Sequence, residues 1–213
     1  MIRAVIFDFD GVLADTMFDN CKAWQDAFKA YGFYMDAMEY YKLEGMGRFQ
    51  IAQYFIDKYF LEPSIKNTVA EAKEMNYKKN NSFKYYDYVY DIFSFLSEKG
   101  IPTAIVTGAS TARINEHLDE NISKSLKALV TAEDVINTKP HPEPYLQAAS
   151  MLGMNAKECL VIENAILGIH SAKSAGCTCF ALETTLNAAD LTEADEVFDS
   201  HKNLFIKLMA LFN

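Results

Sequence analysis

The stretch from Ala4 to Gly11 places four consecutive apolar residues directly before Asp8, and a second aspartate, Asp10, directly before the glycine. An apolar run without alternation that ends in a turn is typical of a buried strand in a parallel sheet. Residues two apart project to the same side of an extended backbone, so the two carboxylates are expected to lie together. Such a pair is costly unless a cation lies between them, and Mg²⁺, which prefers oxygen ligands, is the simplest candidate. Taken alone, the same residues also suit a helix cap followed by an Asp-Gly turn.

Composition and charge limit the classes of function. The 213 residues suit one large domain or two unequal ones, and half of them are hydrophobic, which is enough for a sizeable core. The net charge of -9 disfavours a nucleic-acid partner, because phosphate backbones bind basic surfaces. An anionic substrate would therefore need local positive charge, from a metal ion or from a few Lys and Arg side chains.

No segment predicts secretion or membrane insertion. Asp8 interrupts the first apolar run too early for a signal peptide, and no stretch is long and apolar enough to cross a bilayer. The four cysteines form no Cys-x-x-Cys pair and have no histidine at zinc spacing, so we expect buried free thiols. Together these features predict a cytoplasmic protein without disulfides.

Residues 16–82 have the pattern of a block of helices without a strand. The apolar residues at its start recur at helical spacing: Met17, Cys21, Trp24 and Phe28. Further helical patterns follow, and Pro63 separates two of them, with Ser64 as the expected cap of the second. We therefore predict a helical unit over 16–82, inserted into a core made of residues 1–15 and 83–213.

From residue 83 onward, predicted strands alternate with helices. Apolar runs indicate strands at 101–106, 128–130, 159–162 and 178–182, with helical spacing between them. Strands that alternate with helices imply right-handed crossovers and therefore a doubly wound parallel sheet, so the predicted fold class is α/β.

Polar side chains follow four of the predicted strands: Asp8 and Asp10, then Thr107, then Lys139, then Glu163 with Asn164. Each also has a structural alternative, as a helix cap, a solvated side chain or the start of the next helix. Ligands bind beyond the carboxyl ends of the strands in such folds, and these ends converge in space. We therefore expect the six side chains to form one site.

The chain resembles the haloacid dehalogenase superfamily of phosphotransferases, and specifically its β-phosphoglucomutase-like phosphatase subfamily. The resemblance covers nearly the whole chain. It rests on four motifs in the right order: Asp8-Phe9-Asp10-Gly11-Val12-Leu13, Val106-Thr107-Gly108, Lys139-Pro140-His141-Pro142-Glu143-Pro144-Tyr145, and Val161-Ile162-Glu163-Asn164-Ala165-Ile166-Leu167-Gly168-Ile169. It implies a Rossmann-like core with a helical cap domain inserted just after the first motif.

The resemblance also implies roles for the motif residues. Asp8 would be the nucleophile that becomes an aspartyl-phosphate, and Asp10 would be the general acid and base. Thr107, the Gly108 amide and Lys139 would hold the oxygens of the transferred phosphoryl group.

The implied cofactor is Mg²⁺, and the implied metal-site residues are Asp8, Asp10 through its main-chain carbonyl, Asn164 and Glu163. The expected activity is that of a phosphohydrolase on a small phosphorylated molecule. We expect a monomer, with neither nucleic acid nor a membrane as partner.

Two departures from the family pattern bear on the substrate. The last motif usually offers Glu-Asp or Asp-Asp, whereas this chain has Asn164 in the second position. The cap turn carries Glu44 where the mutases of the subfamily carry Lys, and Asn20 stands where they carry His, although Arg48 is retained. The combination resembles an inorganic pyrophosphatase branch, which makes Glu44 and Arg48 candidates for contact with substrate or metal.

Two alternatives stay open. The first is a β-phosphoglucomutase-type isomerase of hexose phosphates, disfavoured by Asn20 and Glu44. The second is a catalytically silent binding protein on the same scaffold, disfavoured because the acidic pair, Thr107 and Lys139 are retained. Of the remaining polar residues, we expect Lys73 on a solvated helix face, and the histidines on the surface: His117, His141, His170 and His201.

Overall fold

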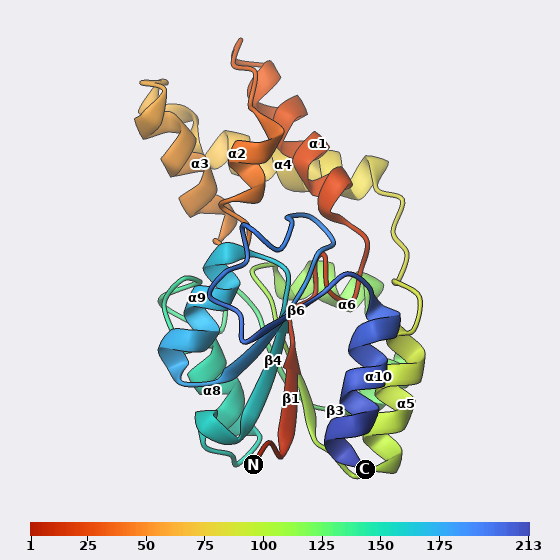
Figure 1. Ribbon diagram of the computed structural model, residues 1–213. Helices are drawn as coiled ribbons and strands as arrows, with labels where there is room; N and C mark the ends of the chain where they lie inside the picture. Colours follow the sequence, from red (N-terminus) through yellow and green to blue (C-terminus); the bar gives the residue numbers. More distant parts are fainter.

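Six parallel strands form one sheet at the centre of the computed structural model, which describes residues 1–213 (Figure 1). Their order is β3-β2-β1-β4-β5-β6. The strands are β1 (Ala4–Phe7), β2 (Thr103–Val106), β3 (Leu126–Val130), β4 (Cys159–Glu163), β5 (Thr178–Leu182) and β6 (Glu196–Phe198). The order of strands reverses between β1 and β4, the point at which ligands bind in doubly wound sheets. The predicted fold class is confirmed.

Helices cover both faces of the sheet, which explains why β1 is apolar at every position. Val5 and Phe7 belong to the hydrophobic cluster of one face, and Ala4 and Ile6 to that of the other. The first face is covered by α5 (Val89–Glu98) and α10 (His201–Phe212), and the second by α8 (Glu143–Met151) and α9 (Ile166–Ala175). In Figure 1 these two pairs of helices lie on opposite sides of the strands.

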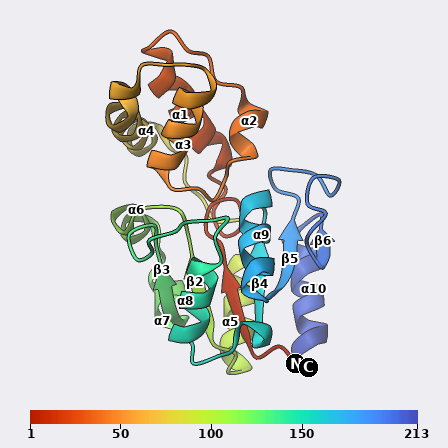
Figure 2. The same cartoon turned by 90° about the vertical axis from the view of Figure 1, so that its left-hand side faces the viewer.

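Four helices form a separate layer above the carboxyl ends of the strands (Figures 1 and 2). They are α1 (Met17–Lys29), α2 (Ala37–Tyr41), α3 (Arg48–Lys58) and α4 (Lys66–Asn80). Their apolar faces pack on one another around Trp24, Phe28 and Phe55, in a cluster distinct from the two of the sheet. We call this layer the cap and the rest the core. The exact division of the chain at residues 16 and 82 stays a prediction.

The two connections between cap and core run side by side. The Asp15 N–H donates to the Lys84 carbonyl and the Tyr86 N–H to the Leu13 carbonyl, both at 3.0 Å. Both termini of the chain lie at the opposite end of the sheet, far from the cap (Figure 2).

Several predicted boundaries differ from the structure, and β4 extends one residue further than predicted, to Glu163. β2 begins at Thr103 and not at residue 101, because the Ile101 N–H closes the turn after α5 through the Leu96 carbonyl and Pro102 has no N–H to donate. β3 begins two residues earlier than predicted, at Leu126. Ser64 does not cap α4: Ser64 lies in a 3-10 turn whose own cap is Glu62.

Other differences concern whole elements. The polar region after β2 forms two short helices, α6 (Thr111–His117) and α7 (Glu120–Ser125), because Asp119 caps a new helix. The strand β6 and the helix α10 lie beyond the last predicted strand. The apolar spacing of Leu204 and Leu208 after the capping Ser200 is the signal that would have revealed α10.

The structure also bears on the predictions about the cysteines and about membrane insertion. All four cysteines are buried and free, as expected. None of the helices combines the length and the apolar character that crossing a membrane requires.

Candidate active site

The residues that follow β1, β3 and β4 meet at one buried point. Phe7 of β1 pairs with Ile162 of β4, so Asp8 and Glu163 lie next to each other at the carboxyl end of the sheet. Lys139 reaches this point from the loop after β3. Its Nζ lies 2.6 Å from Asp8 Oδ1 and 2.7 Å from Glu163 Oε1. The predicted convergence of strand ends therefore holds for these three side chains.

Lys139 is held as a cation in this position. It is 2% exposed, and burial disfavours its charged form. The carboxylates of Asp8 and Glu163 outweigh that effect, so the pKa of Lys139 lies above its ordinary value. A rigid ammonium group beside the Asp8 carboxylate is suited to hold the oxygens of a phosphoryl group.

Glu163 is held in place by four hydrogen bonds. Its Oε1 accepts hydrogen bonds from Lys139 and from the Tyr145 hydroxyl at 2.8 Å, and its Oε2 accepts from the N–H groups of Asn164 and Ala165 at 2.8 and 3.0 Å. Both oxygens thus accept hydrogen bonds within the protein, and the contact of Glu163 with a metal stays a prediction. Glu163 fixes the position of Lys139 and holds the turn between β4 and α9.

Asn164 presents an oxygen without a partner. Its Nδ2 donates to Thr185 Oγ1 at 3.1 Å, whereas its Oδ1 is buried and accepts no hydrogen bond. Gly11, with φ of +78°, allows this close approach, since a Cβ there would lie 2.1 Å from Asn164 Nδ2. A buried oxygen of this kind is expected to serve a bound ion or a catalytic role.

The donor set at this point fits Mg²⁺. No three His, Cys, Asp or Glu side chains are grouped as a metal site. The available donors are the Asp8 carboxylate, the Asp10 carbonyl and the unpaired Asn164 Oδ1, all of them hard oxygens. Magnesium is bound in proteins by one or two carboxylates with carbonyl oxygens and water, so this set suits it better than it suits zinc.

Asp10 faces the cap and has its own partners. Its Oδ2 forms an ion pair with Arg113, and its Oδ1 accepts hydrogen bonds from the Thr16 hydroxyl and, at 3.2 Å, from Asn20 Nδ2. Asp8 and Asp10 line one cavity, as predicted, but they bind different cations. The two carboxylates are therefore prepared for different tasks.

Thr107 and Gly108 lie at the end of β2 and line the same cavity. Thr107 is 5% exposed, and its hydroxyl accepts the Ala109 N–H at 3.1 Å, which holds the turn in shape. Gly108 lies against the cap, since a Cβ on it would be 3.1 Å from the Gly45 carbonyl oxygen. A side chain at 108 would thus require the cap turn to move away from the core.

The cap turn that carries Glu44 and Arg48 covers the site. Gly45 has φ of +95°, and a Cβ there would lie 3.0 Å from the Lys139 side chain. Glu44 Oε2 and Arg48 Nε are buried without hydrogen-bond partners. Burial first, and then the charge of Asp10, raise the pKa of Glu44 to about 7. The turn does face the core site, as predicted for both residues.

Three residues outside the predicted set of site residues also line the cavity. Arg113 lines the cavity from α6, and Asn20 and Lys73 from the cap. Asn20 Oδ1 accepts from Lys73 Nζ at 2.8 Å and from Arg113 Nη1 at 3.0 Å. The expectation of a solvated Lys73 is wrong, because the packing of α4 against α1 buries it to 4% exposure. Burial and the nearby Arg113 lower the pKa of Lys73, while Glu74 opposes them.

Sequence signals existed for Asn20, which stands where the mutases of the subfamily carry His, and for Arg113. The helix α6 begins directly after the Thr107 motif, capped by Ser110, so its first turn starts at the same edge of the sheet. No comparable signal marks Lys73, because the face of α4 that packs inward depends on the arrangement of the cap.

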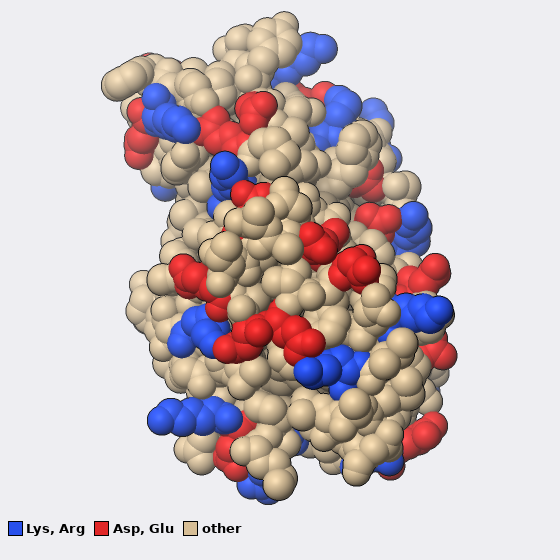
Figure 3. All heavy atoms as spheres, in the orientation of Figure 1, with Lys and Arg blue, Asp and Glu red and all other residues tan.

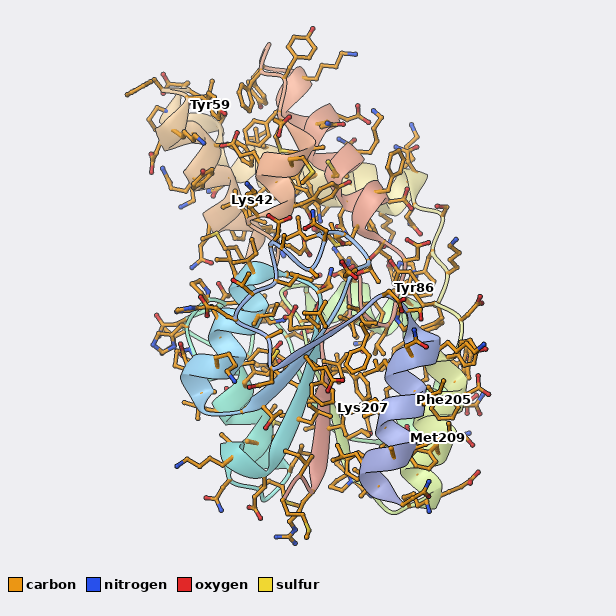
Figure 4. All side chains as sticks on the ribbon, viewed as in Figure 1. Lys42, Tyr59, Tyr86, Phe205, Lys207 and Met209 are labelled. Carbon is orange, nitrogen blue, oxygen red and sulfur yellow. The ribbon has the colours of Figure 1, made fainter.

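Two histidines also differ from expectation. His201 is buried at 8% exposure, stacks on Tyr86 at 4.5 Å between ring centroids, and bonds through Nε2 to the Val12 carbonyl. Figure 4 shows Tyr86 near the cap-side end of α10. His117 is half-buried and stacks on Phe83. The other two histidines, His141 and His170, are exposed as predicted.

Core and cap together enclose the site. The cavity bounded by Asp8, Asp10, Glu44, Lys73 and Arg113 has a volume of about 30 Å³. That volume holds no more than about two or three water molecules. The structure is therefore a closed form, and the cap must move to admit a substrate.

Comparisons with known proteins agree with this architecture. Residues 5–182 match the haloacid dehalogenase-like hydrolase family. Hexitol phosphatase A of Escherichia coli (strain K12) is 26% identical over 204 residues, covering 96% of this chain and 94% of that protein. The structure of β-phosphoglucomutase from Clostridium difficile superposes with a TM-score of 0.85 at 26% identity, covering 100% of this chain and 97% of that one.

A much longer relative matches through one part of its length. Protein SUPPRESSOR OF QUENCHING 1, chloroplastic, of Arabidopsis thaliana is 29% identical over 199 residues, which cover 91% of this chain and 19% of that protein. This chain thus spans about a fifth of that relative.

The chain belongs to the haloacid dehalogenase-like hydrolase family. Within the family, its structural neighbours include β-phosphoglucomutase-like proteins. The resemblance predicted from the four motifs is therefore confirmed at the level of family and subfamily.

Proposed function

We propose that the protein is a Mg²⁺-dependent phosphatase that acts on a small phosphorylated substrate through an aspartyl-phosphate, with inorganic pyrophosphate as the preferred substrate. One observation carries this proposal. Of the four buried side-chain atoms without a hydrogen-bond partner, three belong to residues that line the Asp8 cavity, namely Glu44, Arg48 and Arg113, and the fourth belongs to Asn164, which follows β4 and Glu163. Unpaired buried polar atoms are costly, so their concentration at the Asp8 cavity marks the place where ligands bind.

In the first step, an Asp8 carboxylate oxygen forms a bond to phosphorus while the bond from phosphorus to the leaving oxygen breaks. Lys139, with Thr107 and the Gly108 amide, holds the oxygens of the transferred group. Asp10 lies on the cap side of Asp8 and donates a proton to the leaving oxygen.

In the second step, the aspartyl-phosphate is hydrolysed. Asp10 takes a proton from a water molecule, the resulting oxygen bonds to phosphorus, and the bond to Asp8 breaks, which returns the carboxylate and releases phosphate. The closed cap keeps other water away from this intermediate.

The residues that would hold Mg²⁺ are Asp8, Asp10 through its carbonyl, and Asn164. When bound, the ion neutralises the charge of the phosphoryl group that a carboxylate nucleophile must approach. Asn164 contributes an oxygen but no charge. Glu44, whose unpaired Oε2 is buried in the closed cap, is the additional carboxylate that can complete the site.

The position of Glu44 supports a compact substrate. With Glu44 over the cavity, only a small leaving group leaves room for it, and pyrophosphate is compact and binds Mg²⁺ readily. The related hexitol phosphatase A supports a phosphatase in general.

Acidic and basic side chains are interspersed on the face in Figure 3, with no continuous basic patch that would suit a long nucleic acid. We also propose a monomer that works in the cytoplasm.

A mutase is the second candidate, because a β-phosphoglucomutase is among the structural neighbours. Glu44 and Asn20 oppose it, since they stand where the mutases of the subfamily carry Lys and His. Incubation with β-glucose 1-phosphate separates the two activities, because a mutase yields glucose 6-phosphate and a phosphatase yields free glucose.

The test of the proposed function is a phosphate-release screen at fixed Mg²⁺ over pyrophosphate, sugar phosphates and nucleotides. We expect pyrophosphate to have the highest kcat/KM. Preference for a sugar phosphate would overturn the substrate assignment. Release from none of the compounds would favour the silent binding protein.

A further inference from the structure

Arg113 is a buried cation that the steps above do not use. Its residue is 8% exposed, and its guanidinium group lies 4.6 Å from the centre of the Tyr77 ring. One terminal nitrogen pairs with Asp10 and the other donates to Asn20 Oδ1. The third donor, Nε–H, is buried without an acceptor. Arginine presents these donors as a rigid fork that matches phosphate oxygens, so the unused one points to a ligand.

Arg113 belongs to a group of three cations from three different elements. Arg48 of α3 and Lys73 of α4 line the same cavity as Arg113 of α6. Arg48 also has a buried Nε–H without an acceptor. Two arginines with unused donors around one cavity match an anion that has several acceptor oxygens, such as a phosphate group.

The location of Arg113 assigns this anion to the leaving side of the substrate. The transferred phosphoryl group belongs beside Asp8 and Lys139, and Asp10, which protonates the leaving oxygen, lies between that point and Arg113. The cavity also borders a second hollow of about 260 Å³, and four residues line both: Arg48, Glu74, Ser110 and Arg113. Glu74 forms an ion pair with Lys73. A leaving group that passes Asp10 therefore meets the two arginines next.

We propose that Arg113 binds a second phosphate group on the leaving side, which makes the site specific for substrates with two phosphate groups close together. The class comprises inorganic diphosphate and compact bisphosphates. The inference rests on the proposed phosphohydrolase function and narrows its substrate class. The Nε–H of Arg113 is available to this phosphate without loss of the pair with Asp10.

A purely structural role for Arg113 would have a different effect on ligand binding. Through Asn20, Arg113 also joins the core to the cap, so its removal could loosen closure over every substrate equally. A phosphate receptor instead affects only those ligands that carry the second phosphate. The two roles are separated by a pair of ligands that differ in that group.

The experiment compares the binding of methylenediphosphonate, which is not hydrolysed, with that of methylphosphonate, by calorimetry at constant Mg²⁺. The proteins are wild type, Arg113→Met and Arg113→Lys, with Arg3→Met as matched control. Arg3 pairs with Glu158 on the exposed surface at the opposite end of the sheet. Circular dichroism checks that each variant is folded. If Arg113→Met does not fold, Arg113→Lys, which keeps the charge, is compared with wild type in its place.

We expect Arg113→Met to weaken methylenediphosphonate by about 10- to 100-fold, the usual range for a hydrogen bond to a charged group, and methylphosphonate by less than about 3-fold. Arg113→Lys should lie between wild type and Arg113→Met, and Arg3→Met should match wild type. In turnover, the KM for pyrophosphate should rise while that for p-nitrophenyl phosphate stays constant.

Equal losses for both ligands would overturn the proposal in favour of the structural role, and so would unchanged affinity for methylenediphosphonate. Because the ligands are not hydrolysed, this outcome is separate from the proposed function. A protein that releases no phosphate from any compound would refute the hydrolase while leaving the binding comparison valid.

Discussion

The site has a core half, formed by residues of the core, and a cap half, formed by residues of the cap. The two differ in how many of their polar groups have hydrogen-bond partners. In the core half, Lys139 bridges Asp8 and Glu163, and Glu163 accepts four hydrogen bonds. In the cap half, Glu44 and Arg48 each keep a buried polar atom without a partner. Two buried atoms of the core half are also unpaired: Asn164 Oδ1, which belongs to the expected metal-site residues, and Arg113 Nε on α6.

This difference separates a preorganised half from a half that a ligand completes. Fixed dipoles and charges stabilise a transition state because they need no reorganisation during the reaction, and the network around Lys139 is of that kind. Unpaired groups on a mobile cap instead favour closure only when a substrate or a metal supplies the missing contacts. We therefore assign the chemical steps to the core half of the site, and substrate selection to the cap half and to Arg113.

The largest expected effect is the loss of the nucleophile. Asp8→Asn should lower turnover by about 10³-fold or more, since no other group in the core half can accept the phosphoryl group. Phosphate release and a circular dichroism spectrum provide the measurement. Asp15→Asn, on the same segment and paired with the exposed Lys84, is the control and should retain turnover. Substantial turnover by Asp8→Asn, or full activity in excess chelator, would refute the division of roles.

The second prediction tests whether the cap restricts the size of the substrate. The cap can open to admit a small ester and close over it, whereas the backbone of a phosphorylated protein would lie between cap and core and prevent closure. We expect measurable release from a small phosphate ester and none above background from a phosphorylated protein, with both followed as free phosphate under the same conditions. Comparable kcat/KM values on the two would mean that cap closure plays no part in selection.

The third prediction tests whether the two halves share the metal. Opposite charges about 4 Å apart attract by roughly 4 kcal/mol at an effective dielectric of 20, before desolvation offsets much of it. We therefore expect Glu44→Gln to weaken Mg²⁺ binding by about 10-fold, and by less when Asn164→Asp restores a charge. Calorimetric titration and pyrophosphate turnover form the double-mutant cycle.

The control for this cycle is Glu71→Gln, at an exposed position of the cap helix α4. It should leave Mg²⁺ binding unchanged. If the effects of Glu44→Gln and Asn164→Asp simply add, the two halves do not cooperate in holding the metal. If Glu44→Gln has no effect at all, pyrophosphate loses its main support as substrate.

The smallest expected effect concerns the folding stability of the core, to which the buried His201 contributes. Burial lowers the pKa of His201 below its ordinary value, so the unfolded chain binds the proton more readily than the folded one. The contribution of His201 is therefore complete above about pH 6.5 and is lost as the pH falls toward the folded pKa. His201→Gln should reduce the loss of stability between pH 7.5 and 5.5 by about 1 kcal/mol, measured by urea unfolding. His170→Gln, at an exposed position, should match wild type; an equal pH dependence in His201→Gln would contradict the assignment.

The sequence predicted the core half better than the cap half. Asp8, Lys139 and Asn164 follow strands or the loops directly after them, and parallel strand ends must converge, so their meeting follows from topology. The place of Glu163 followed from topology too, whereas its hydrogen bonds with Tyr145 and two N–H groups could not be read from sequence position; its contact with a metal stays a prediction.

Local patterns by themselves determined that this chain forms a doubly wound parallel sheet with helices inserted after the first strand, and that acidic residues end that strand. These properties depend on apolar periodicity and turn residues, which act over short distances along the chain. Only the tertiary structure decided that Lys73 and His201 are buried, that Arg113 pairs with Asp10, and that Glu44 is enclosed over the site. These contacts join residues far apart in sequence, and they depend on which face of each helix the packing of cap against core turns inward.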